Sequence, residues 1–230
     1  MALTTRLPIP DAEPFYGFVE TTGDALRLIQ AARQGVIPRI TRRLNDLERR
    51  AMIKSGSVFI FSKEESGIKR WTEGLSWSAS RIVGNFLVYR EVTERGLGRS
   101  SHLSSETHRS RRRINPNNLT SAEQADKKFE RALVGCLADD RGRFKPSGLI
   151  KKTITVNIEG SEHHLIAYYR QDDVRLGILK HPRSRLDIMA LGIPPELLES
   201  TKFRIPPVTE PLVDGRPHYM SVVLFLPKSP

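Results

Sequence analysis

Runs of apolar and β-branched residues predict several strands. The clearest is residues 149–158, where Ile and Val alternate with polar side chains, as in a strand with one buried face. Residues 165–169 predict its antiparallel partner, with Gly160 in the hairpin turn between them. Residues 58–61 and 86–89 predict two short buried strands. Weaker strand patterns cover residues 15–19 and 221–226.

A second periodicity predicts helices. Between residues 24 and 33 apolar residues recur every three or four positions, with Thr22 or Asp24 as the expected cap and Gly35 as the end. Residues 129–137 place Phe129 and Leu133 on one helical face. Shorter helical segments are expected at residues 45–50 and 195–200. Together these elements predict an α+β fold dominated by an antiparallel sheet, with a few short helices.

One stretch has a different character. Residues 96–126 are rich in Ser, Arg and Asn and nearly lack large apolar side chains, so we expect a flexible linker. It contains a basic cluster at residues 109–113. A solvated charge run, a nuclear import signal and an auxiliary phosphate contact are equally open interpretations of that cluster.

Composition limits the class of protein. The chain has 230 residues, 38% of them hydrophobic, which suits one large domain or two small ones. No apolar run approaches the roughly 20 residues of a membrane span, and the first residues do not resemble a secretory signal. The single cysteine, Cys136, excludes an internal disulfide framework and fits a reducing compartment.

The charge balance points to an anionic partner. Lys and Arg number 37 against 26 acidic residues, a formal net charge of +11. The basic residues are clustered rather than spread evenly, and six of them fall within sixteen residues: Arg39, Arg42, Arg43, Arg49, Arg50 and Lys54. Clustering favours a binding surface over a merely solvated one.

The most informative segment is residues 66–89, which holds both tryptophans of the chain. Lys69, Arg70 and Arg81 lie among Trp71, Trp77, glycines and small hydroxyl residues. Cationic groups neutralise phosphate, hydroxyls and backbone N–H groups fix register, and glycines permit close backbone approach. This mixture is typical of a surface that touches a polyanion.

The same segment resembles the signature of the fungal WOPR-domain transcriptional regulators, which control morphology and developmental switching. The resemblance rests on PFYGFVETTGDALRLIQAA from Pro14, SGSVFIF from Ser55, SGIKRWTEG from Ser66, SRIVGNFLVYRE from Ser80, LIKKTITV from Leu149 and HLIAYY from His164. It implies a DNA-binding domain at residues 10–206, made of two interdigitated regions, 10–95 and 127–206. Residues 96–126 would join them, and residues 207–230 would form a C-terminal extension.

Lys69, Arg70 and Thr72 are the first candidates for DNA contact. An arginine on a glycine-flanked loop can enter a narrow A·T-rich minor groove, although Arg70 could equally stack on a tryptophan. The resemblance, which implies a minor-groove arginine, favours DNA. A second patch with Arg39, Thr41, Arg42 and Arg43 suits phosphates and base edges, and one of its arginines could instead be the inserted one.

The remaining candidates have strong structural alternatives. Asn85 could read adenine or simply form a turn after Gly84. Lys151 and Lys152 could touch phosphate or protect a strand edge. Thr72 follows two basic residues, as basophilic kinases prefer, and is a candidate for regulatory phosphorylation. The third contact set contains Ser78, Ser80, Arg81 and Asn85.

Enzyme motifs are missing from the sequence. We find no GxGxxG, P-loop or GxSxG pattern, and His163 and His164 are adjacent, so a strand would point them to opposite faces. We therefore expect no enzyme activity, cofactor, metal, small-molecule substrate or membrane. The sequence and the resemblance together predict a nuclear regulator that binds double-stranded, A/T-rich DNA through the sheet in the major groove and an arginine in the minor groove. Other transcription regulators are possible partners, and a basic RNA-binding or protein-interaction module is the alternative.

Overall fold

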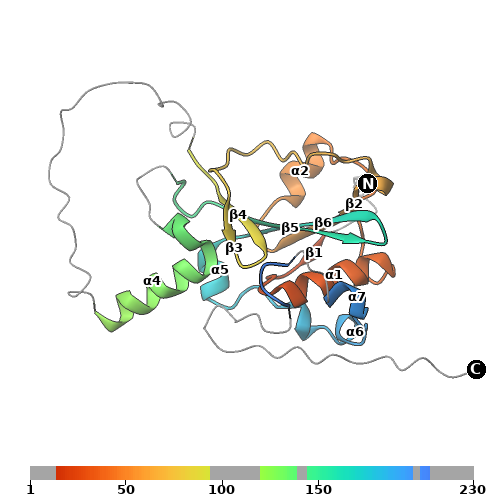
Figure 1. The fold of residues 1–230 in the computed structure, drawn as a ribbon. Coiled ribbons are helices and arrows are strands. Elements are labelled where there is room, and N and C mark those ends of the chain that lie inside the picture. Colours follow the sequence, from red (N-terminus) through yellow and green to blue (C-terminus); the bar gives the residue numbers. More distant parts are fainter. Residues whose placement is uncertain (1–13, 94–119, 139–143, 199–202, 208–230) are drawn as a thin grey trace, which may run out of the picture.

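The computed structural model describes residues 14–93, 120–138, 144–198 and 203–207. Within them the chain forms one six-stranded antiparallel sheet flanked by short helices (Figure 1). The strand order is β1-β2-β6-β5-β4-β3. The strands are β1 (Phe15–Tyr16), β2 (Ser57–Ser62), β3 (Arg81–Val83), β4 (Phe86–Arg90), β5 (Ile150–Ile158) and β6 (Ser161–Tyr169). The predicted α+β class with a mainly antiparallel sheet is confirmed.

The order of the strands interleaves two parts of the chain. The β5–β6 hairpin lies at the centre, with β2 paired to β6 and β4 paired to β5. Strands β1 to β4 come from the first predicted region, whereas β5 and β6 come from the second. Each region therefore supplies hydrogen-bonding partners that the other one needs, as the interdigitated arrangement requires.

One face of the sheet packs against α1 (Thr22–Arg33). Alternate strand residues point to this side, including Val58, Ile60, Leu165 and Val88. Leu26, Leu28 and Ile29 of α1 are fully buried there. Helices α6 (Leu186–Met189) and α7 (Pro195–Leu198) lie on the same side as α1 (Figure 1). This larger core makes the face unavailable for ligands.

The opposite face carries a second, smaller core. Phe59, Phe61, Ile166 and Tyr168 project from β2 and β6 and are buried. The chain covers them with two segments: residues 40–53, which include α2 (Asp46–Met52), and residues 68–77, which include both tryptophans. Figure 1 shows α2 and the chain that follows β2 on the side of the sheet away from α1.

The predicted helices are confirmed with shifted boundaries. Helix α1 is capped by Thr21, one residue before Thr22, and the other expected candidate, Asp24, completes a capping box at the third helical position. Asn45 caps α2 in the same way with Glu48. Helix α4 (Ser121–Val134) begins within the predicted linker and is followed by the 3₁₀ turn η3 (Gly135–Ala138). The 24–33, 45–50 and 129–137 patterns therefore mark real helices.

Other short elements had no sequence prediction. These are β3, α3 (Lys63–Ser66), α5 (Gln171–Arg175), η4 (Pro182–Ser184) and α6. The predicted 15–19 strand is confined to Phe15 and Tyr16, although Phe18 and Val19 are buried beside α1. The 221–226 strand, the basic cluster at 109–113 and nearly all of the C-terminal extension lie outside the described residues.

Candidate nucleic-acid interface

The segment from Gly67 to Gly74 crosses the small core; it bends at Lys69 and Arg70 and runs on without regular structure through residues 71–73. Gly67 ends α3 with φ of +64°, and Gly74 has φ of +78°; both values favour glycine. Between them, Lys69, Arg70 and Thr72 are exposed. Within the described residues neither Lys69 nor Arg70 forms an ion pair. These two cations are therefore available to an external anion.

Trp71 and Glu73 point the other way, into the protein. The Trp71 indole N–H donates to the Tyr168 hydroxyl at 2.7 Å, and its ring stacks on Phe61 at 5.5 Å between centroids. The Glu73 carboxylate accepts from the Lys151 ammonium at 2.5 Å, and the Glu73 side chain is only 3% exposed. Burial, followed by the negative charge of Glu73, raises the pKa of Tyr168 far above its usual value.

The basic segment at residues 39–43 lies beside this connection. Ile40 and Leu44 pack into the same small core as Ile68 and Trp71, so both basic segments lie on one face of the molecule. Thr41 and Arg43 are exposed. The second predicted patch therefore neighbours the first, although the two are separated by more than twenty residues of sequence.

Two arginines of that patch have internal partners. Arg39 donates to both carboxylate oxygens of Glu65 through Nε, and Arg42 forms a two-pronged pair with Glu48. These hydrogen bonds are the main cause of the lowered pKa of Glu48 and of Glu65. The Arg39–Glu65 pair is exposed on both sides, and such pairs contribute about 0–1 kcal/mol, so Arg39 can exchange its carboxylate for a phosphate. The Glu48 carboxylate is buried, so the exchange costs Arg42 more.

The third predicted set is divided by the structure. Arg81 is exposed at the start of β3 and donates only to the neighbouring Ser80 carbonyl among the described residues. Ser78 is half-buried; its backbone N–H donates to the Arg90 carbonyl, and its hydroxyl accepts from the Arg90 N–H. Ser80 is also half-buried. Arg81 alone of this set has the access that a phosphate contact needs.

Asn85 does not fit the expected base contact. Its amide donates to the Thr22 hydroxyl at 2.8 Å and to the Ile205 carbonyl at 2.7 Å, and it accepts from the Ile205 N–H at 2.9 Å. The side chain thus joins the β3–β4 turn to α1 and to residues 203–207. Because its hydrogen-bonding groups are occupied within the fold, the Asn85 amide has no free donor and acceptor pair to offer an adenine.

The two lysines of β5 also face inward. Lys152 is 6% exposed, and its ammonium donates to the Val19 and Glu20 carbonyls at 3.0 and 2.7 Å. The Lys151 ammonium pairs with Glu73 and lies 4.5 Å from the centroid of Trp77 and 4.6 Å from that of Tyr89. The expected phosphate contacts are incompatible with these positions, because extracting either cation would break buried interactions.

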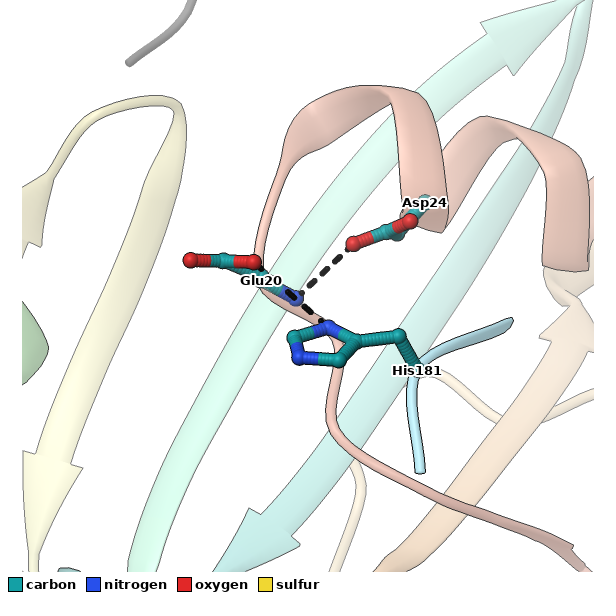
Figure 2. A group of neighbouring side chains, drawn as sticks. All are labelled: Glu20, Asp24 and His181. Carbon is teal, nitrogen blue, oxygen red and sulfur yellow. Dashed lines mark hydrogen bonds and ion pairs between the residues drawn. The ribbon is translucent and has the colours of Figure 1, made fainter. Parts of the chain in front are cut away.

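One cluster has the side chains of a metal site. The ligand atoms of Glu20, Asp24 and His181 lie within 4.8 Å of one another, and Figure 2 shows the three side chains converging. Arg183 pairs with Glu20 and lies 3.7 Å from Asp24, so a cation is already present. Asp24 also accepts the N–H groups of Glu20 and Thr21. We therefore interpret this cluster as an internal ion-pair network.

Sequence reasoning missed one residue that matters to the site. Glu73 was not singled out, although it stands two residues after Trp71 in an extended segment, a spacing that places both side chains on the same side. Arg50 and Lys54 are further exposed cations on the same face. Lys54 lies over the Tyr16 ring at 4.9 Å.

Comparison with known proteins identifies the family. The Gti1/Pac2 family matches residues 14–170, which include all six strands. The chain belongs to the Gti1/Pac2 family. Among its relatives, "Global transcription regulator sge1" of Fusarium oxysporum f. sp. lycopersici is 39% identical over 217 residues, covering 86% of this chain and 65% of that protein. The "cAMP-independent regulatory protein pac2" of Schizosaccharomyces pombe is 33% identical and covers 84% and 88% respectively.

Solved structures of this family include DNA complexes. The structure titled "Complex of WOPR domain of Wor1 in Candida albicans with the 13bp dsDNA" matches with a TM-score of 0.53 and 32% identity, covering 80% of this chain and 93% of that one. The resemblance to the WOPR family is thus confirmed. The chain spans about two thirds or less of the length of most of these regulators; for sge1 of Verticillium dahliae the share is 44%. No helix among the described residues is long and apolar enough to span a membrane.

Proposed function

We propose that this Gti1/Pac2 chain is a sequence-specific, double-stranded DNA-binding domain of a fungal transcription regulator that acts in the nucleus. The observation that carries the proposal is the anchored Gly67–Gly74 connection with Lys69, Arg70 and Thr72 outward. Relatives named as transcription regulators and the DNA complex of the Wor1 WOPR domain support it. The expectation that the chain is not an enzyme is confirmed by these relatives.

The proposed contacts fall into two classes. Lys69 and Arg43 neutralise backbone phosphates, with Arg39 and Arg42 joining when they leave their carboxylates. Arg81 pairs directly with Val88 and so projects to the α1 side at the edge of the sheet, away from this surface. Arg70 enters the minor groove, where a narrow A·T-rich tract concentrates negative potential. We therefore propose an A/T-rich site. Thr41 and Thr72 supply hydroxyls at the same surface.

A competition experiment tests the function. A preferred duplex is first selected from random sequences, and the labelled complex is then challenged with a large excess of scrambled duplex. Specific complexes survive, because specific sites bind about 10³–10⁷ times tighter than non-specific DNA. If scrambled duplex or single-stranded RNA displaces the probe as well as the preferred site does, the basic face binds by charge alone and the proposal is wrong.

A further inference from the structure

The DNA-facing side chains have no internal contacts that fix their direction. Among the described residues, Lys69, Arg70 and Thr72 make no ion pair or side-chain hydrogen bond, and the flanking Gly67 and Gly74 have open space around them. A free connection of this kind would lose conformational entropy on binding, which lowers affinity. Something else must therefore hold the connection in place.

Buried side chains hold the connection on both sides of its exposed residues. Ile68 is buried in the small core before Lys69 and Arg70, and two polar anchors follow them. Trp71 and Glu73 point inward while Thr72, between them, points outward, as extended backbone dictates. Fixing Trp71 and Glu73 thus fixes the direction of their neighbours. The anchors act on the backbone of the connection without touching any external ligand.

Both anchors are held by the second region of the chain. Trp71 donates to Tyr168 of β6, and Glu73 pairs with Lys151 of β5. The two partner residues are neighbours, because Lys151 of β5 lies directly opposite Tyr168 of β6 in the sheet. The Lys151 ammonium is further enclosed by the rings of Trp77 and Tyr89. Lys151 and Tyr168 of the central hairpin thus support the Gly67–Gly74 connection, which comes from the first region of the chain.

We propose that Tyr168, Glu73 and Lys151 are positioning residues for DNA recognition, which preorganise Lys69, Arg70 and Thr72 through Trp71 and the backbone. This inference rests on the proposed function and adds to it. Preorganisation raises affinity by reducing the ordering that binding requires, and a supported loop reads sequence more sharply than a loose one. Removing a support should therefore weaken discrimination without removing any DNA contact.

Tyr168→Phe is the sharpest variant, because it removes only one hydroxyl, which accepts the Trp71 N–H and also interacts with the Glu73 carboxylate. Tyr169→Phe is its matched control: Tyr169 is equally buried, but its hydroxyl donates to the Leu133 carbonyl on the α1 side of the sheet. Full-length variants are titrated with the preferred and scrambled duplexes, and their thermal unfolding is measured in parallel. Glu73→Gln, which keeps the side-chain shape, serves as a second variant in case Tyr168→Phe does not fold.

We expect Tyr168→Phe to lower the ratio of specific to non-specific affinity about three- to tenfold, the effect of one hydrogen bond. Tyr169→Phe should leave that ratio unchanged even if its unfolding temperature falls equally. In an Arg70→Ala background, Tyr168→Phe should lower the ratio by less than it does in the wild type, because the main side chain that it positions is already gone. Glu73→Gln should reproduce the loss of discrimination.

Several results would overturn the inference. If Tyr168→Phe and Tyr169→Phe have the same ratio of specific to non-specific affinity, the network only stabilises the fold. The same conclusion follows if the effects of Tyr168→Phe and Arg70→Ala on that ratio are additive. If the wild-type chain itself does not discriminate between duplexes, the proposed function fails, and the positioning role fails with it. A discriminating wild type with an insensitive Tyr168 variant would reject only the positioning role.

Discussion

At the scale of single residues, the structure separates side chains that the sequence presents together. In the KRWTEG motif, Lys69, Arg70 and Thr72 are exposed, whereas Trp71 is half-buried and Glu73 is buried. The exposure of the basic residues could be predicted from the sequence, because basic residues among glycines rarely lie in a hydrophobic core. The inward direction of Lys151 could not be predicted, because nothing in the alternation of its strand indicates that the buried Glu73 carboxylate lies against it.

Asn85 tests whether a residue that is hydrogen-bonded within the fold is also dispensable for DNA recognition. Asn85→Ala removes three hydrogen bonds that join the β3–β4 turn to Thr22 and Ile205. We expect the free energy of unfolding to fall by about 1–3 kcal/mol, measured by denaturant titration. The preference for the selected duplex over a scrambled one should stay the same. If the folded Asn85→Ala variant no longer prefers the selected duplex, Asn85 does contact a base.

Thr72 tests the exposed group itself. Phosphorylation would add about −1.5 to −2 charges at the proposed DNA surface, and would also attract Lys69 and Arg70 away from phosphate. We expect Thr72→Glu to bind the same duplex more weakly than Thr72→Ala at equal salt. Equal affinities of the two variants would place Thr72 off the interface and would weaken the roles proposed for its two basic neighbours.

At the scale of elements, periodicity predicted the central hairpin but not its neighbours. The alternation in residues 149–158 and the turn at Gly160 match β5 and β6. Nothing in that alternation indicates that β2 pairs with β6 and β4 with β5; the interleaving was implied only by the family resemblance. Strand β3 escaped prediction because it is three residues long and exposes Ile82.

Helix α4 shows where compositional reasoning erred. Its first turn is polar and was assigned to the linker, yet Thr120 and Glu123 form a capping box. The Thr-x-x-Glu spacing is visible in the sequence and is a recognised start signal for a helix. Local capping patterns should therefore outweigh composition when the boundary of a linker is drawn.

The interleaved sheet makes a prediction at the same scale. Residues 14–93 expressed alone lack the β5–β6 hairpin on which β2 and β4 pair, and we expect no cooperative thermal unfolding by circular dichroism. Residues 120–207 alone should behave likewise, and an equimolar mixture should recover β-sheet signal and cooperativity. Cooperative unfolding of either fragment by itself would show that the two regions are separate folding units.

At the scale of the whole molecule, the two faces of the sheet have different tasks. The α1 side contains the larger core, and the other side combines a small aromatic core with exposed cations. The net charge of +11 predicted an anionic partner. It could not predict how many cations are available, because Lys152 is buried, and Lys151, Arg39 and Arg42 are paired with carboxylates.

Because the two faces of the sheet differ, an arginine on the α1 side is a matched control for the claim that Arg70 contacts DNA. Arg185 is exposed like Arg70, but it lies beside α6, on the α1 side of the sheet, where it pairs with Asp187. Arg70→Ala and Arg185→Ala therefore remove the same charge from opposite sides of the molecule. Any difference between them reports the position of the DNA rather than the total charge.

The most direct test is to titrate wild-type protein, Arg70→Ala and Arg185→Ala with the selected A/T-rich duplex and with its scrambled counterpart at one salt concentration. We predict that Arg70→Ala loses about 1–3 kcal/mol of binding free energy on the selected duplex and little on the scrambled one, so that discrimination falls. Arg185→Ala should retain the wild-type ratio. A specific wild-type complex whose ratio is unchanged by Arg70→Ala would contradict the account and would move the groove-reading role to Arg39, Arg42 or Arg43.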